Sequence, residues 1–133
     1  MVDTTRATLA AIPLFAGLDG EALIWLAERT TPFEAPAGHV LVEVGQPGAG
    51  LFVIEAGEVE VELAGRVVVL GAGEFFGEIA LLTDRTRTGR VQAKTAVRCR
   101  ALARADLTRL LAEQPEIAVH MLPVLAGRLA DAT

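Results

Sequence analysis

The spacing of apolar and polar residues along this chain changes twice. Near the N-terminus, Leu18, Ala22 and Leu26 recur at helical spacing, and Asp19 stands at the N-cap position of that helix. From Pro32 onward, short apolar segments are separated by glycine-rich turns, which is typical of strands. Helical spacing then returns near the C-terminus. The pattern therefore predicts helix, then β-barrel, then helix.

The central strands are predicted most clearly by the segment EVEVEL at residues 58–63. It alternates strictly, so Val59, Val61 and Leu63 should face a core while the three glutamates face water. Further strands are predicted at HVLVEV (39–44), LFVIEA (51–56), RVVVL (66–70), RVQAKT (90–95) and VRCRALA (97–103). Short strands joined by glycine turns predict a mainly β fold with flanking α-helices, in which the β part is a double-stranded β-helix (jelly-roll) barrel.

The chain length of 133 residues fits a single domain. We expect one domain over residues 1–133, with an N-terminal helical segment at 4–30, the barrel at 32–103 and C-terminal helices at 105–131.

Two helices are predicted in the C-terminal part. In ADLTRLLAEQ (105–114), Asp106 is a plausible cap, and the second helix opens at Pro115, a residue favoured in a first turn. Pro123 lies inside this second helix and lacks a backbone donor, so it is predicted to kink or split the helix. One face of the first helix is apolar, through Leu107, Leu110 and Leu111.

Composition and charge narrow the class of protein. A content of 52% hydrophobic and 22% charged residues is that of a globular chain, and no apolar run approaches the roughly 20 residues that span a bilayer. The single cysteine, Cys99, permits no internal disulfide, and the N-terminus does not resemble a secretory signal. We therefore expect a cytoplasmic protein. A net charge of −5 argues against non-specific nucleic-acid binding.

Half of the twelve basic residues lie close together without an acid between them, and this local positive charge suggests a small anionic ligand. They are Arg85, Arg87, Arg90, Lys94, Arg98 and Arg100. For Arg98 and Arg100, we favour the simpler interpretation of a solvated strand face. Cys99 between them could have a lowered pKa and be redox-active, although a buried strand residue is favoured.

The segment GEFFGEIALLTDRTRTGRVQA (73–93) carries the most specific chemistry. After Gly77, the free N–H groups of Glu78, Ile79 and Ala80 could face an anion at the start of a short helix. Arg87 offers a planar donor fork that matches phosphate oxygens, Thr88 offers a hydroxyl, and the Glu78 carboxylate can accept hydrogen bonds from a sugar. These groups predict a phosphorylated sugar ligand. A structural ion pair between Glu78 and Arg87 is the open alternative.

These residues resemble the cyclic nucleotide-binding domain family. The phosphate-binding cassette of that family reads approximately F-G-E-[LI]-A-L-[LM], a spacer, and then P-R-[AST]-A-[TS]-V. FGEIALL, from Phe76 to Leu82, matches throughout, and TRTGRV, from Thr86 to Val91, occupies the second half, so the cassette is placed at 75–91. The resemblance extends nearly end to end, through IPLFAGLDGEAL, PAGHVLVEVGQPGAGLFVIEAGEVEV and RADLTRLLAEQPEIAVHMLPVLAGRL.

The resemblance implies a reversible regulatory sensor of cAMP or cGMP, which is not an enzyme and needs no metal or further cofactor. By the match, Glu78 would take the ribose 2′-hydroxyl and Arg87 the cyclic phosphate, while Gly77 and nearby amides complete the phosphate cradle. Ligand capture would move the C-terminal helix and signal to an effector, as in regulators of transcription. The predicted ligand-binding residues are Phe76, Gly77, Glu78, Ile79, Ala80, Arg87 and Thr88.

Three positions depart from the family pattern. Thr86 replaces the usual proline, and Gly89 and Arg90 stand where a small residue and then Thr or Ser are expected. An arginine at position 90 either adds a second cation near the phosphate or clashes with the barrel wall. We expect cAMP to be favoured over cGMP, and no membrane or direct nucleic-acid contact.

Two other functions compete with the nucleotide sensor. A metal-dependent cupin enzyme would need clustered histidines, but the chain has only His39 and His120, which are predicted on different parts of the fold. The stronger rival is a degenerate domain that has lost its ligand and serves in protein interaction or dimerisation. Its contact face would be Ile117, Met121, Val124, Leu125 and Leu129.

Overall fold

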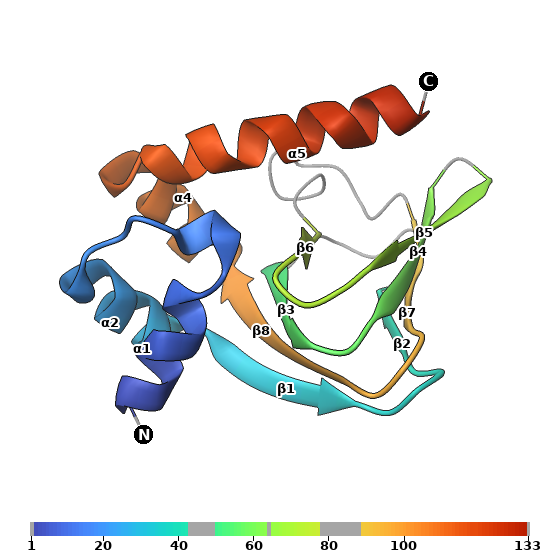
Figure 1. Ribbon diagram of the computed structural model, residues 1–133, viewed down its shortest axis with the longest axis horizontal. Coiled ribbons are helices and arrows are strands. Elements are labelled where there is room, and N and C mark those ends of the chain that lie inside the picture. The colour runs from blue at the N-terminus through green and yellow to red at the C-terminus, as the bar shows by residue number, and fades with distance from the viewer. Residues whose placement is uncertain (1, 43–49, 64, 78–88, 133) are drawn as a thin grey trace. The chain divides into compact units, whose positions relative to one another are not determined.

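The computed structural model of the chain (Figure 1) describes residues 2–42, 50–63, 65–77 and 89–132. The chain forms two compact units. One joins Met1–Arg29 with Ala105–Thr133, and the other is Thr30–Arg104. The first unit is helical and the second is built from strands, so the two helical parts of the sequence come together in one unit.

The β unit contains two four-stranded sheets in which all paired strands are antiparallel. The first sheet has the order β1 (Thr31–Ala35), β8 (Val97–Ala103), β3 (Gly50–Ala56) and β6 (Phe75–Phe76). The second has the order β2 (Val40–Val42), β7 (Val91–Ala93), β4 (Val59–Leu63) and β5 (Arg66–Leu70). This jelly-roll-like arrangement with helices at both ends of the chain confirms the predicted fold class.

The alternation in β4 is observed as predicted. Val59 and Val61 are buried, whereas Glu58 and Glu62 are exposed and Glu60 is partly exposed. The side chain of Leu63 lies outside those that the structure describes. One core cluster contains buried residues from both sheets: Ala35, Val42, Ile54, Val59, Val61, Leu70, Phe76, Val91, Ala93, Val97 and Cys99.

Two short strands were not predicted. β1 has no regular alternation and contains Pro32, which is accommodated because β1 is the edge strand of its sheet. β6 is only two residues long, Phe75 and Phe76, and its pairing with β3 depends on residues far away in the sequence. Of the predicted segment 39–44, β2 covers Val40–Val42, and residues 43–44 lie outside the described part.

The helices are α1 (Val2–Ala10), a 3-10 turn η1 (Pro13–Phe15), α2 (Gly20–Arg29), α4 (Arg104–Glu113) and α5 (Glu116–Ala132). The Asp19 carboxylate accepts a hydrogen bond from the backbone N–H of Ala22 at 2.8 Å, which confirms the predicted N-cap. The start of the next predicted helix needs correction. α4 begins at Arg104, so Asp106 lies within the first turn, where an acid stabilises the helix dipole without capping it.

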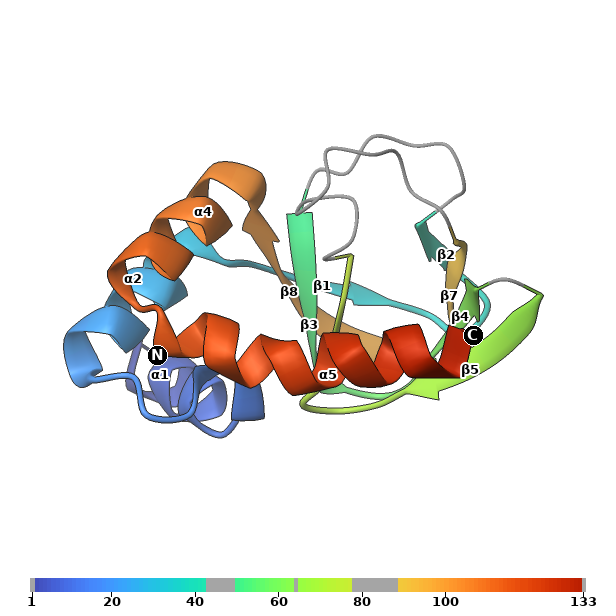
Figure 2. The ribbon, with the colours of Figure 1, turned by 90° about the horizontal axis from the view of Figure 1, so that it is seen from above.

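The last helix is not split at Pro123 (Figure 2), so of the two predicted outcomes, a split or a kink, the split is wrong. α5 runs as one helix from Glu116 to Ala132, seen as the unbroken red ribbon of Figure 1. Pro123 lacks the N–H that would donate to the carbonyl of Val119. Val119 is 63% exposed, so water can hydrate that carbonyl and the loss of one hydrogen bond stays local. Pro115 lies just before the helix, and its carbonyl accepts from the amide of Ala118.

Candidate functional site

The predicted phosphate-binding cassette connects the two sheets of the β unit. β6 belongs to the first sheet and ends at Phe76, and β7 belongs to the second and begins at Val91. The connection between them contains five of the predicted ligand residues, which all lie outside the described residues: Glu78, Ile79, Ala80, Arg87 and Thr88. Of the seven predicted site residues, the structure therefore describes Phe76 and Gly77.

The strand that leads into the cassette is held by a tight turn. The amide of Gly73 donates to the carbonyl of Ile54 at 2.8 Å, and the amide of Ile54 donates to the carbonyl of Glu74 at 2.9 Å. The Glu74 carboxylate also accepts from the amide of Gly71 at 2.7 Å. These bonds fix β6 against β3 immediately before the predicted binding residues.

Phe76 is a core residue of the barrel. Its ring stacks on Phe52 with centroids 5.0 Å apart and an interplanar angle of 20°, and Phe33 meets Phe52 edge-on at 5.7 Å. Phe76 is buried in the cluster shared by the two sheets. In the described residues, the structure therefore gives Phe76 a packing role beside the cassette, and a contact with ligand stays a prediction.

Gly77 has the backbone conformation that glycine favours. Its φ of +94° lies in the region that L residues with a side chain rarely adopt. The strand β6 ends one residue earlier, so the chain turns at this glycine as it enters residues 78–88. A glycine here lets the backbone change direction without strain, which agrees with the predicted need for Gly77 at this position.

The chain returns from the cassette into the second sheet at Arg90. Its carbonyl accepts a hydrogen bond from the backbone N–H of Glu62 at 2.9 Å, and Val91 begins β7, which lies between β2 and β4. The side chain of Arg90 is half-buried. Both ends of the cassette are thus anchored by strand pairing, one in each sheet.

The two arginines of β8 differ in their environments, and the prediction that both lie on a solvated face is wrong for Arg100. The side chain of Arg98 is 53% exposed, whereas that of Arg100 is 11% exposed. Arg100 Nε lies 3.4 Å from Glu55 Oε1 on β3, and Arg100 Nη1 donates to the Thr30 hydroxyl at 2.9 Å. The sequence pattern missed this network because Glu55 and Thr30 are remote from Arg100 along the chain.

Cys99 faces the barrel core between these arginines. Burial and, to a smaller extent, the nearby Glu55 carboxylate together raise the pKa of its thiol to about 11. The thiol is therefore protonated at neutral pH. This confirms the prediction of a buried strand residue and is opposite to the lowered pKa that a redox-active thiol requires.

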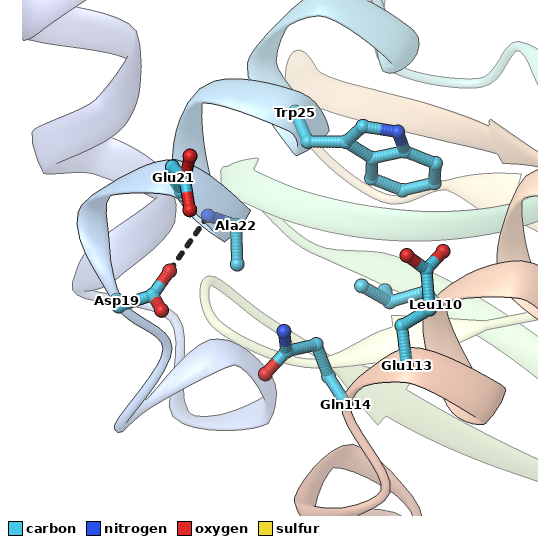
Figure 3. A pocket seen from close by; sticks show the side chains of 7 residues that line it. All are labelled: Asp19, Glu21, Ala22, Trp25, Leu110, Glu113 and Gln114. Carbon is cyan, nitrogen blue, oxygen red and sulfur yellow. Dashed lines mark hydrogen bonds between the residues drawn. The ribbon is translucent and has the colours of Figure 1, made fainter.

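A separate pocket lies within the helical unit (Figure 3). It has a volume of about 280 Å³, and its lining residues are Asp19, Glu21, Ala22, Trp25, Leu110, Glu113 and Gln114. The carboxylates of Asp19 and Glu113 are already engaged, the first in the α2 cap and the second with Arg109 Nε at 2.7 Å. Three acidic residues without a basic residue in the lining make this pocket unsuited to a phosphate.

Neither a metal centre nor a membrane segment is found in the part of the chain that the structure describes. No three His, Cys, Asp or Glu side chains there are grouped so that they could hold a metal ion. His39 is exposed beside β2, and His120 lies on α5 with Nδ1 3.1 Å from the carbonyl of Leu14. Within the same described ranges, no helix combines the length and apolarity needed to cross a bilayer.

Comparison with known proteins assigns the family. Residues 32–114 match the cyclic nucleotide-binding domain, a range that includes every strand from β2 to β8 and the whole predicted cassette. The chain belongs to the cyclic nucleotide-binding domain family. This confirms the resemblance found in the sequence.

Two curated relatives of this cyclic nucleotide-binding domain are regulated proteins of different kinds. A cyclic nucleotide-gated potassium channel of Rhizobium etli is 40% identical over 83% of this chain. A CRP-like cAMP-activated global transcriptional regulator of Mycobacterium tuberculosis is 32% identical over 91% of this chain. The chain spans 31% of the length of the channel and 57% of the length of the regulator.

Solved structures agree with the family and fold. The catabolite activator protein of Thermus thermophilus is 31% identical with a TM-score of 0.76, and the match covers 90% of this chain and 59% of that protein. A cAMP-binding acyltransferase from Mycobacterium smegmatis is also 31% identical, with a TM-score of 0.81 over 98% of this chain and 42% of that protein. The same domain fold therefore occurs within a catabolite activator protein and within an acyltransferase.

Proposed function

We propose that this chain is a regulatory sensor that binds cAMP in preference to cGMP in the cassette between β6 and β7. The observation that carries the proposal is the cassette sequence itself, FGEIALL followed by Arg87, within a chain of this family. The anchoring of Phe76 and Arg90 in opposite sheets supports it, because both ends of the binding segment are held in place by strand pairing.

Different residues are proposed to bind the sugar and the phosphate of the ligand. Glu78 accepts the ribose 2′-hydroxyl, and the Arg87 guanidinium forms a charge-assisted pair with the cyclic phosphate. The amides of Ile79 and Ala80 donate to the remaining phosphate oxygens, and Gly77 lets the backbone approach closely. Thr88 adds a hydroxyl donor beside Arg87.

The preference for cAMP is supported by the relatives. The M. tuberculosis regulator is described as cAMP-activated and the M. smegmatis acyltransferase as cAMP-binding. We propose that residues 1–133 act as one such module without catalysis of their own, and that ligand capture moves α5, which passes the signal to an effector. A connection between two sheets is a suitable trigger, since a ligand that orders it acts on both sheets.

The test is calorimetric titration of the protein with cAMP and with cGMP, beside the variant Arg87→Ala. We expect one-site binding by the wild type and a loss in the variant on the order of 2 to 5 kcal/mol, or about 30-fold to several thousand-fold in Kd, because the phosphate loses its cationic partner. Arg98→Ala is the matched control, since Arg98 is exposed and outside the cassette. Unchanged affinity in Arg87→Ala would refute the site.

A second variant, Glu78→Gln, examines the sugar contact. Replacing the carboxylate by an amide turns a charged hydrogen bond into a neutral one, and we expect binding to weaken by roughly 1 to 2 kcal/mol with the fold intact. A thermal melt that shows unfolding of this variant would favour the structural ion pair with Arg87 instead. Absence of any binding by the wild type would favour the degenerate, ligand-free domain.

A further inference from the structure

β5 is an edge strand of the second sheet. Among the strands that the structure describes, it pairs with β4 alone, at one end of the order β2, β7, β4, β5 (Figure 1). An edge strand presents a row of main-chain groups that can bond to another strand. The hydrogen bonds between β4 and β7 show which main-chain groups of β5 point toward this open side.

The hydrogen bonds between β4 and β7 show which residues of β4 direct their main-chain N–H and C=O groups toward β7. The amide of Glu62 donates to the carbonyl of Arg90 at 2.9 Å, and the carbonyl of Glu58 accepts from the amide of Lys94 at 2.9 Å. Both bonds lie on the β7 side. Because main-chain groups in a strand alternate in direction, the even-numbered residues of β4 point toward β7 and the odd-numbered residues point toward β5.

The direction of the main-chain groups of β5 follows from the direction of those in β4. Val61 of β4 is directly opposite Val68, so Val68 directs its main-chain N–H and C=O toward β4. Its two neighbours, Val67 and Val69, then direct theirs to the open edge. The hydrogen bonds described for the chain give those outward groups no partner.

The side chains at this edge are apolar and exposed. Val67 is 57% exposed and Val69 is 42% exposed. Natural edge strands usually carry a charge, a proline or a bulge that discourages pairing. β5 has one charge, the exposed Arg66 at its first position, and residues 67–70 contain only valine and leucine. β-branched residues also favour the extended conformation, so this edge is ready to accept another strand.

We propose that β5 pairs antiparallel with β5 of a second copy of this chain, about a two-fold axis at Val68. The segment VVV is symmetric about its centre, so Val67 of one copy lies opposite Val69 of the other, and the converse holds. Both residues point their main-chain groups outward, so the two opposed pairs form hydrogen bonds in both directions. The same pairing places the four exposed valine side chains beside one another on one face of the joined sheet, where each partly covers its cross-strand neighbour.

The charges around β5 are compatible with a second copy. On β4, Glu60 lies opposite Val69 and Glu62 lies opposite Val67, so glutamates flank the valines on the side away from the new contact. In the pair, the two β4 strands lie three strand spacings apart, about 14 Å. This exceeds the Debye length of about 8 Å at physiological ionic strength, so their repulsion is screened.

The size of the contact sets its strength. Two paired five-residue strands bury far less than the roughly 1,200 Å² of stable specific complexes, so the dimer is weak and depends on concentration. Each copy carries a net charge of −5, so added salt should strengthen the association. The contact does not depend on the nucleotide site.

The experiment is sedimentation velocity of the full chain over a concentration series reaching the millimolar range, at low and at physiological salt. We expect the wild-type mass to rise reversibly toward that of two chains. Val69→Pro removes one outward N–H and no bond to β4, and Val67→Lys places a charge at the edge. Each variant should weaken association more than about tenfold.

Leu122→Lys is the matched control, because Leu122 is an exposed apolar residue of α5 and should leave association unchanged. A thermal melt of each variant verifies folding, and Val67→Lys keeps the test valid if Val69→Pro does not fold. A single-chain mass for the wild type at every concentration would overturn the proposal. The proposal would also be overturned if both edge variants folded and associated as strongly as the wild type, or if only Leu122→Lys lost association.

Discussion

β4 and β8 have the same sequence pattern but different environments. EVEVEL and the first four residues of VRCRALA both alternate charged residues with apolar ones, and in both stretches the apolar set faces the core, through Val59 in β4 and Cys99 in β8. The other face of β4 is open to water at Glu62. The other face of β8 is open at Arg98 and closed at Arg100, which is paired with Glu55.

The difference shows what alternation can and cannot predict. A period of two determines which residues share a face, because successive side chains of a strand point in opposite directions. It does not determine whether the second face is covered, since that depends on strands and side chains brought in from elsewhere. Arg100 illustrates this, because its contacts are Glu55 on a neighbouring strand and Thr30 before β1.

The largest expected effect comes from removing the buried cation. Arg100→Met leaves the Glu55 carboxylate, whose side chain is only 6% exposed, beside an apolar residue, with the half-exposed Arg98 still paired to it at 4.0 Å. Breaking a buried ion pair in this way costs about 3 to 5 kcal/mol of the free energy of unfolding, which urea denaturation measures. Arg98→Met on the same strand removes an exposed cation whose Nε lies 4.0 Å from the same carboxylate, and this more distant and more solvated pair should cost no more than about 1 kcal/mol.

The double variant Arg100→Met with Glu55→Leu sharpens this comparison. Replacing both charges by apolar residues removes the uncompensated carboxylate, so we expect most of the lost stability to return. Equal and small losses for Arg100→Met and Arg98→Met would mean that the faces of β4 and β8 are equally solvated.

An intermediate effect is expected at Gly57, which joins β3 of the first sheet to β4 of the second. Its φ is +90°, and a Cβ there would collide with the carbonyl oxygen of Ala96. Gly57→Ala should therefore lower the free energy of unfolding by at least about 2 kcal/mol. Gly65, in the turn within one sheet, has φ +78° with open space around it, so Gly65→Ala should cost about 1 kcal/mol. Similar losses at both positions in urea denaturation would contradict the close approach at Gly57.

The pH dependence due to Cys99 is the smallest effect near neutral pH, because it develops only above pH 9. Its pKa is raised from 9.0 to about 11 in the folded state, so the unfolded thiol loses its proton first as pH rises. This contribution is fully present below pH 9 and is lost between pH 9 and 11, by roughly 3 kcal/mol for a shift of about two pKa units. Urea denaturation of the wild type and of Cys99→Ala over this range measures it. Parallel pH curves for the two proteins would show that Cys99 is not shielded.

The strands and helices with strong local patterns were predictable from sequence. The segment 97–103 coincides with β8, and Asp19 caps α2 as expected. β6 was not predictable, because two residues carry no period and its pairing with Phe52 is long-range. For the candidate site, the sequence indicated the cassette and its chemistry, while the anchoring of Phe76 in one sheet and Arg90 in the other became visible only with the strand order.

The sequence by itself determined the family, the jelly-roll class and the proposed ligand, because these depend on short motifs and on local periodicity. Only the tertiary structure decided that Arg100 is buried in an ion pair, that α5 continues through Pro123, and that β5 lies at the end of its sheet among the described strands. Each of these depends on which groups from distant parts of the chain, or from water, satisfy a side chain or a backbone atom. Contacts of that kind are set by the packing of the whole chain, and a local pattern does not contain them.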